Sequence, residues 1–71
     1  MNLAETIALN LRLVMSARRK NAPELAAGVG VTKAAVYGWL EGRAMTLENL
    51  EACARELRVS PAHLCRGWSR E

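Results

Sequence analysis

The chain has 71 residues, which is enough for one small domain and too few for two. Hydrophobic residues make up 51% of it, phenylalanine is absent, and good helix formers outnumber β-branched residues. The formal net charge of +3 permits a nucleic-acid partner without requiring one. We therefore expect a single all-α domain spanning residues 1–71, folded as a compact five-helix bundle.

The two cysteines, Cys53 and Cys65, do not form a CxxC pair, and each falls inside a helical pattern. We expect two buried, reduced thiols, because a free cysteine behaves as a small hydrophobic residue. With His63 as the single histidine, the ligands are too few for a metal site, and we expect no metal and no cofactor. Reduced thiols, no secretory leader and no apolar run of membrane-spanning length predict a cytoplasmic protein without a membrane partner.

The first predicted helix runs from about Leu3 to Arg18. Its apolar residues recur at the helical period and predict one buried face. That face consists of Leu3, Ile7, Leu11, Val14, Met15 and Arg18. Leu9 and Leu13 point the other way, so they either pack on a later helix or form an exposed pair that meets a partner.

The segment "NAPE" predicts the start of a second, short helix. Asn21 can cap it, Pro23 fits its first turn, and Glu24 can complete a capping box. This helix ends at about Gly28. The dipeptide Val29-Gly30 breaks it, because glycine tolerates a left-handed turn.

The third predicted helix covers about Thr32 to Glu41, with Thr32 as its cap and Gly42 just past its end. Its outward positions carry no carboxylate and are small or amphipathic. These positions are Lys33, Ala34, Tyr37 and Gly38. A bare surface of this kind can approach another molecule closely.

The second and third helices are joined so tightly that they must cross at a steep angle. Ala26 is small where the two helices come closest, and Gly30 makes the turn. Val36 on the third helix fills the space between the two helices. This spacing is the helix-turn-helix pattern.

Two further helices complete the chain. Thr46 caps the fourth, which ends at about Leu57, and Ser60 caps the last, with Pro61 in its first turn. Gly67 follows the end of the last helix. The inward residues of the fourth helix are predicted to be Leu47, Leu50, Ala54 and Leu57.

From about Ile7 to Trp68 the chain resembles the lambda-repressor-like, or Cro/repressor-type, helix-turn-helix domains, also called the XRE family. The resemblance rests on "ELA" (24–26), "VGVT" (29–32), "VYGWLEG" (36–42) and "LRVSPAHLCRG" (57–67). It implies a sequence-specific regulator of transcription that binds double-stranded DNA, of the phage, prophage or bacterial repressor type. It also implies a homodimer on a palindromic operator.

The resemblance assigns roles to individual residues, with the third helix in the major groove. The base-reading positions would be Thr32, Lys33, Ala34, Tyr37 and Gly38. The phosphate-contacting positions would be Asn21, Ala22 and Arg43. The motif itself would be held together by Ala26, Gly30, Val36 and Trp39.

The chain departs from the family at several positions. Arg19 and Lys20 stand where the family often has Gly and Leu, so the joint between the first two helices is expected to be unusual. Ala22 stands where the family usually has Gln, which removes one side-chain contact to a phosphate. Met15 and Leu40 stand where the family often has an Arg–Glu pair. An apolar pair can replace a buried ion pair without loss of stability, and we expect Met15 and Leu40 to touch.

Two other classes of function compete with DNA binding. A protein-interaction module of the same fold, such as an adaptor or antitoxin, would fit the mild charge and the alanine-rich third helix. For the dimer expected of a DNA-binding regulator, one candidate surface is formed by Leu64, Trp68 and the tail, unless Trp68 caps the protein's own core. An enzyme is not expected, because His63 has neither a nucleophile–base arrangement nor an orienting group, and no small-molecule ligand is evident.

Overall fold

The computed structural model describes residues 1–69, and these form five α-helices and no strand. The helices are α1 (Leu3–Arg18), α2 (Ala22–Val29), α3 (Lys33–Leu40), α4 (Leu47–Leu57) and α5 (Pro61–Leu64). The predicted all-α class is confirmed, and α2 extends one residue beyond its predicted end. None of the helices in this part of the chain is long and apolar enough to cross a membrane.

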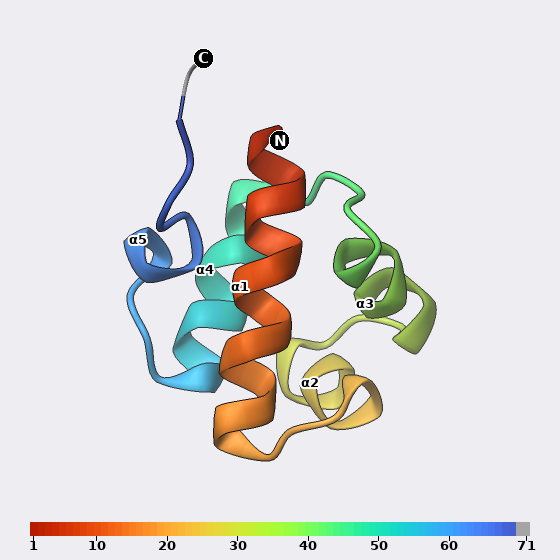
Figure 1. The fold of residues 1–71 in the computed structure, drawn as a ribbon. Helices are drawn as coiled ribbons and strands as arrows, with labels where there is room; N and C mark the ends of the chain where they lie inside the picture. The colour runs from red at the N-terminus through yellow and green to blue at the C-terminus, as the bar shows by residue number, and fades with distance from the viewer. Residues whose placement is uncertain (70–71) are drawn as a thin grey trace.

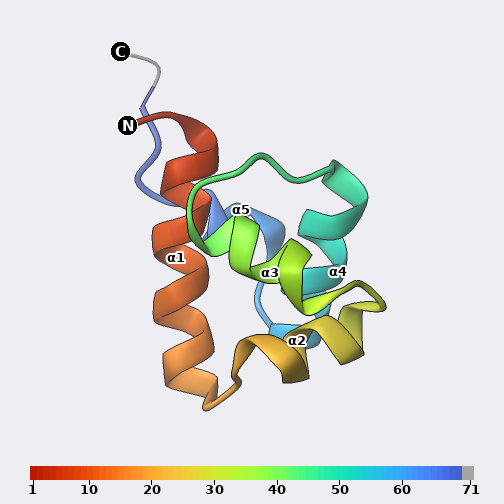
Figure 2. The same ribbon diagram turned by 90° about the vertical axis from the view of Figure 1, so that its right-hand side faces the viewer.

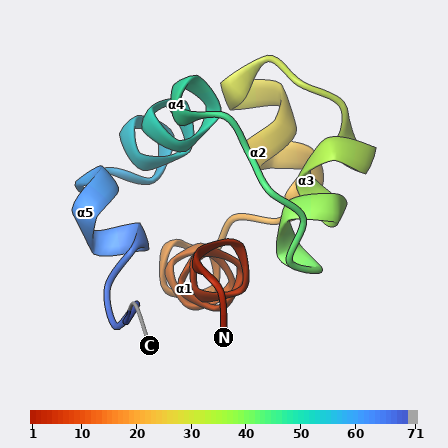
Figure 3. The ribbon, with the colours of Figure 1, turned by 90° about the horizontal axis from the view of Figure 1, so that it is seen from above.

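Helix α1 is the element around which the others are arranged (Figure 1). Seen from above, α4 and α5 lie on one side of it and α2 and α3 on the other (Figure 3). Helix α1 packs against α3, α4 and α5, while α2 packs against α3 and α4. This arrangement encloses one core and leaves the far side of α3 at the surface.

The predicted helix starts are confirmed by hydrogen bonds. The side chains of Asn21, Thr32, Thr46 and Ser60 each accept a hydrogen bond from the backbone N–H three residues later. Asn2 caps α1 in the same way and forms a capping box with Glu5. Each helix therefore begins where a short polar side chain satisfies one of its free N–H groups.

The core is built from the inward faces of all five helices. Its fully buried side chains are Leu11, Leu25, Val36, Cys53, Leu57 and Leu64. Because Leu64 is fully buried, it is not part of a surface that could anchor a partner. Trp68 is 44% exposed and belongs to the large hydrophobic side chains at the surface.

Three predictions about buried faces were wrong at the ends of helices. Leu47 was expected to point inward but is 78% exposed, and Leu3 is also exposed. Each is the first residue of its helix, where no other element packs over the side chain. Arg18, the last residue of α1, is exposed too.

Leu9 and Leu13 are exposed, by 51% and 64%. Of the two alternatives for this pair, packing on a later helix is therefore wrong. The two side chains lie one turn apart and form a small apolar patch on α1.

Polar side chains of α1 bind the C-terminal ends of three other helices. Asn10 Nδ2 donates to the carbonyl oxygens of Leu64 (2.8 Å) and Arg66 (2.9 Å) at the end of α5. The last carbonyls of a helix lack partners within the helix, so these bonds supply what the helix cannot.

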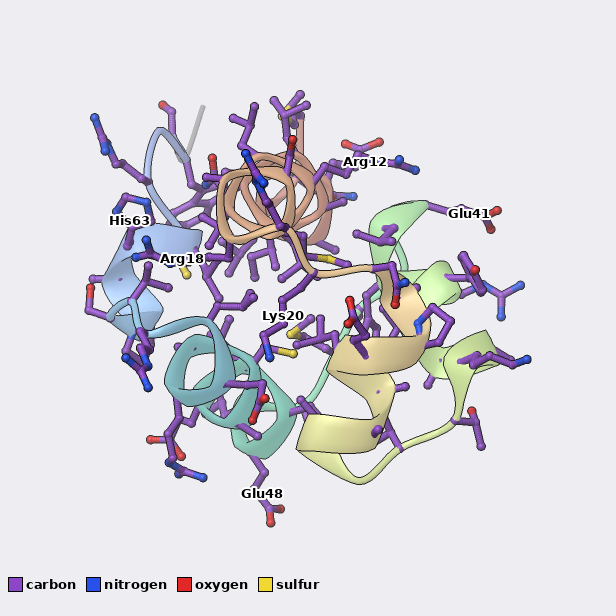
Figure 4. All side chains as sticks on the ribbon, turned by 90° about the horizontal axis from the view of Figure 1, so that it is seen from below. Arg12, Arg18, Lys20, Glu41, Glu48 and His63 are labelled. Carbon is purple, nitrogen blue, oxygen red and sulfur yellow. The ribbon has the colours of Figure 1, made fainter. Side chains whose placement is uncertain are left out.

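The other two bonds come from arginines. Arg12 Nε donates to the carbonyl of Leu40 (3.1 Å) at the end of α3, and Arg18 Nε donates to that of Leu57 (2.9 Å) at the end of α4. The two arginines leave α1 in different directions, Arg12 toward α3 and Arg18 toward α4 and α5 (Figure 4). The helix dipole also stabilises a positive charge near the C-terminus of a helix.

The cysteines differ in their surroundings. Both are free; Cys53 is fully buried, as predicted, whereas Cys65 is only half-buried. Burial raises the pKa of the Cys53 thiol to about 11, because the thiolate would lose its hydration.

We expect Asn10→Asp to destabilise the fold at neutral pH. The substitution keeps the shape of the side chain but turns the donor into a carboxylate facing two carbonyl oxygens. The free energy of unfolding should fall by roughly 1–3 kcal/mol, measured by urea denaturation.

The loss should shrink as the pH falls and the new carboxyl group becomes protonated, since it can then donate one hydrogen bond. Asn10→Ala, which removes the donor without adding charge, is the control and should show no such pH dependence. Equal stability of Asn10→Asp and wild type at pH 7 would contradict the assigned bonds.

The Cys53 thiol should make stability fall in alkaline solution. Its folded-state pKa, about 11, lies above the ordinary value of 9.0. The contribution is complete below pH 9 and is lost as the pH rises toward 11, because the unfolded chain ionises first. The unfolding free energy of wild type should therefore decline more steeply over this range than that of Cys53→Ala, and equal slopes would contradict the prediction.

Candidate nucleic-acid interface

The turn between α2 and α3 is fixed by backbone hydrogen bonds and one glycine. The N–H groups of Gly30 and Val31 both donate to the carbonyl oxygen of Ala26, at 2.8 and 3.0 Å. Gly30 has a φ of +89°, a left-handed conformation that strains a residue with a side chain. The glycine at this position therefore sets the angle at which the chain enters α3.

The residues predicted to hold the motif together are buried between its helices and the rest of the core. Ala26, Val36 and Trp39 are each at most 5% exposed. Ala26 lies on α2 and the other two on α3, and all three belong to the same core cluster. They support α3 from behind, so none of them faces solvent.

The opposite side of α3 is open to solvent. Helix α3 lies at the front of the molecule in Figure 2, with α2 below it. The side chains of Thr32, Lys33, Ala34 and Tyr37 are exposed on it, and no acidic residue occurs in the helix. The Thr32 hydroxyl accepts the N–H of Ala35 (3.1 Å), and its own hydrogen remains available as a donor.

Gly38 differs from the predicted bare surface, because it is buried. The side chain of Arg43, which comes from the loop after α3, covers it. A Cβ atom built on Gly38 would lie 3.1 Å from Arg43 Cδ and 3.9 Å from its Cβ and Cγ. At this position the surface of α3 is therefore presented by Arg43.

The start of α2 forms the edge of the same region. Asn21 Oδ1 accepts the N–H of Glu24 (2.9 Å), and Glu24 Oε1 accepts the N–H of Asn21 (3.0 Å). The Ala22 side chain is buried, while its N–H is a first-turn donor without an intrahelical partner. The Glu24 carboxylate brings a negative charge to this turn, which partly offsets its attraction for an anion.

Lys33 and Arg43 are the positive charges on this face. The ion pair recorded among residues 1–69 joins Lys20 Nζ to Glu56 Oε2 (3.1 Å), on the opposite side of α2. Neither Lys33 nor Arg43 has an ion-pair or hydrogen-bond partner for its side chain in the described part of the chain. Both side chains can therefore bind an external anion or acceptor.

Within the described residues no three side chains of the metal-binding types gather into a possible metal site. The exposed α3 face has donors, apolar contact groups and positive charge instead. This set of groups suits the edges of DNA bases and the DNA backbone.

A family model for the Cro/C1-type helix-turn-helix DNA-binding domain matches residues 10–66. The chain belongs to this family. No curated protein and no solved structure matched the chain. The predicted family is thus confirmed over most of the chain. The matched residues include α2, the turn and α3, which together form the helix-turn-helix of this DNA-binding domain.

At the end of α3 in this Cro/C1-type domain, two contacts could not be predicted from the sequence. One is the bond from Arg12 to the end of α3, and the other is the placement of Arg43 over Gly38. A glycine inside a helix was the only available signal for the second, because glycine is a poor helix former.

The expected contact between Met15 and Leu40 is consistent with the structure. Met15 belongs to the core, Leu40 packs against that core, and both line one hollow of about 240 Å³ beside Arg12. The position that often holds a family Arg–Glu pair is thus occupied by apolar side chains.

Met15→Arg alone should destabilise the domain by about 3 kcal/mol, because it places a charge in the core without a partner. Adding Leu40→Glu should recover part of that loss by restoring an ion pair. Urea denaturation of both single variants and the double variant would measure the coupling. If Met15→Arg alone cost no stability, the proposed contact would be wrong.

Proposed function

We propose that this domain is a sequence-specific regulator of transcription of the phage, prophage or bacterial repressor type, acting in the cytoplasm or nucleoid. Helix α3 enters the major groove of double-stranded DNA. The observation that supports this most directly is the solvent-exposed face of α3, which has no acidic residue and carries positive charge without an internal partner. Membership of the Cro/C1-type family supports the same orientation.

The base-reading groups are proposed on the first two turns of α3. Lys33 donates to guanine acceptors, and the Ala34 methyl group contacts a thymine methyl. Tyr37 is 51% exposed and offers both a ring and a hydroxyl group. Thr32 supplies a hydroxyl donor at the helix start, while Gly38 contributes through its lack of a side chain rather than as a reader.

The phosphate contacts are proposed at the start of α2. The exposed Asn21 side chain and the Ala22 N–H lie together there. The partial positive charge of a helix N-terminus favours a phosphate at this position. These contacts orient the domain without reading sequence.

A homodimer on a palindromic operator would supply the second half of the contacts. Half-sites one helical turn apart, about 34 Å, match a pair of recognition helices. A single copy has few contacts, and linking two copies raises the effective affinity. Half-exposed Trp68 is the proposed dimer anchor, since Leu64 is unavailable.

One observation favours a second function, in which the domain binds another protein. The exposed pair Leu9 and Leu13 on α1 is apolar and lies away from α3. An adaptor or antitoxin-like domain could use such a patch without specific DNA binding.

The test is a selection of bound sequences from a random duplex library at two salt concentrations. Enrichment of a palindrome is the expected result and would separate the two functions. Absence of enrichment, with binding lost at the higher salt, would leave only electrostatic attraction and would refute the proposed function.

Lys33→Ala and Tyr37→Ala should each lower the preference for the enriched site over its single-base variants by roughly tenfold. Tyr37→Phe distinguishes the hydroxyl from the ring, and Arg66→Ala is a control for a change of charge on an exposed residue of another face. Unchanged base preference in both alanine variants would refute the assignment of readers.

A further inference from the structure

Gly38 lies on the same side of α3 as the exposed residues Ala34 and Tyr37 but is itself buried, and its neighbours in the sequence do not explain why a glycine stands there. It follows Tyr37, which is exposed, and it lies one turn after Ala34, which is also exposed. Glycine disfavours a helix, and its backbone here needs no left-handed conformation. The reason for a glycine must therefore lie in what packs on it.

Arg43 packs on it. The aliphatic stem of Arg43 lies across the glycine, so closely that an added Cβ would be 3.1 Å from Arg43 Cδ. The backbone of the same residue is fixed to the helix, because the Arg43 N–H donates to the Gly38 carbonyl oxygen at 3.0 Å. Gly38 therefore holds the Arg43 backbone by a hydrogen bond and leaves room for the aliphatic stem of Arg43 to pack on the helix.

Arg43 is exposed, so the guanidinium group beyond this packed stem is accessible to an external molecule. Its stem is packed, which reduces the number of rotamers that the long side chain must give up on binding. No described residue holds the guanidinium by an ion pair or hydrogen bond. Its planar donors remain available for an external acceptor.

We propose that Arg43 reads a guanine in the major groove, in place of the phosphate contact that its loop position predicts. The proposal rests on the proposed function, since it requires α3 in that groove. A guanidinium can donate two parallel hydrogen bonds to guanine O6 and N7, which the single ammonium group of Lys33 cannot do in the same fixed geometry.

The packing of the Arg43 stem on Gly38 is what favours a base over a phosphate as the acceptor for Arg43. A phosphate accepts hydrogen bonds from many directions and can be reached by a flexible loop arginine. A base edge demands a fixed position and plane, which a packed stem provides. Specificity at one base pair would thus depend on a residue outside α3 and on a glycine that touches no DNA.

The experiment measures affinity for the selected duplex and for all its single-base variants, with four main proteins and two further variants as controls. The main proteins are wild type, Gly38→Ala, Arg43→Ala and the double variant. Arg43→Ala should abolish discrimination at one G·C pair in each half-site, lowering the preference there by roughly ten- to a hundredfold. Gly38→Ala should weaken discrimination at that same pair by several-fold, because the new methyl group displaces the arginine stem.

The double variant should discriminate no worse than Arg43→Ala alone, since the glycine acts only through the arginine. Arg43→Lys keeps the charge and should still lose the guanine preference. Lys33→Ala, the matched control, should affect a different base pair, and thermal unfolding of Gly38→Ala shows whether the fold is kept.

Two outcomes would overturn the proposal while leaving the proposed function intact. One is a uniform loss of affinity for all duplexes in Arg43→Ala, with a smaller salt dependence, which is the behaviour of a phosphate contact. The other is a loss in Gly38→Ala that persists in the Arg43→Ala background. Failure of wild type to enrich any sequence would instead refute the proposed function itself.

Discussion

The structure depends on hydrogen bonds from one helix to the ends of three others. Asn10, Arg12 and Arg18 of α1 bind the C-terminal carbonyl groups of α5, α3 and α4 respectively. In a domain of this size the buried apolar surface alone gives a modest margin of stability. The polar bonds add direction, because each holds a helix end at one position relative to α1, whereas apolar packing tolerates some sliding.

The orientation of α3 follows from this constraint together with the turn before it. At its start, Gly30 fixes the angle between α2 and α3, and at its end, Arg12 holds the carbonyl of Leu40. Val36 and Trp39 fill the space behind the helix. The loop that carries Arg43 therefore leaves α3 from a fixed point, which is what allows its side chain to settle on Gly38. A DNA-reading surface needs this rigidity, since a base edge is discriminated only by donors held in place.

The helix ends, the turn and most of the buried residues could be predicted from the sequence, whereas exposure at the helix ends and on the outer side of α1 could not. Asn21, Thr32, Thr46 and Ser60 cap helices through bonds to residues three positions away, and such local bonds can be read from the order of residues. Leu47 and Leu9 were harder, because periodicity gives the direction of a side chain but not whether another element reaches it. The base-reading and phosphate assignments on α2 and α3 remain predictions, since they concern a partner molecule.

The sequence by itself determined the helices, the glycine turn and the membership of the Cro/C1-type family. These features arise from interactions among residues close in the chain and from a spacing that brings Ala26, Gly30 and Val36 together. Only the tertiary structure decided that Arg12 binds the last carbonyl of α3, that Leu9 and Leu13 stay exposed, and that Arg43 covers Gly38. Those outcomes depend on how separate elements pack and on where a long side chain comes to rest against a neighbour, and neither is encoded in local spacing.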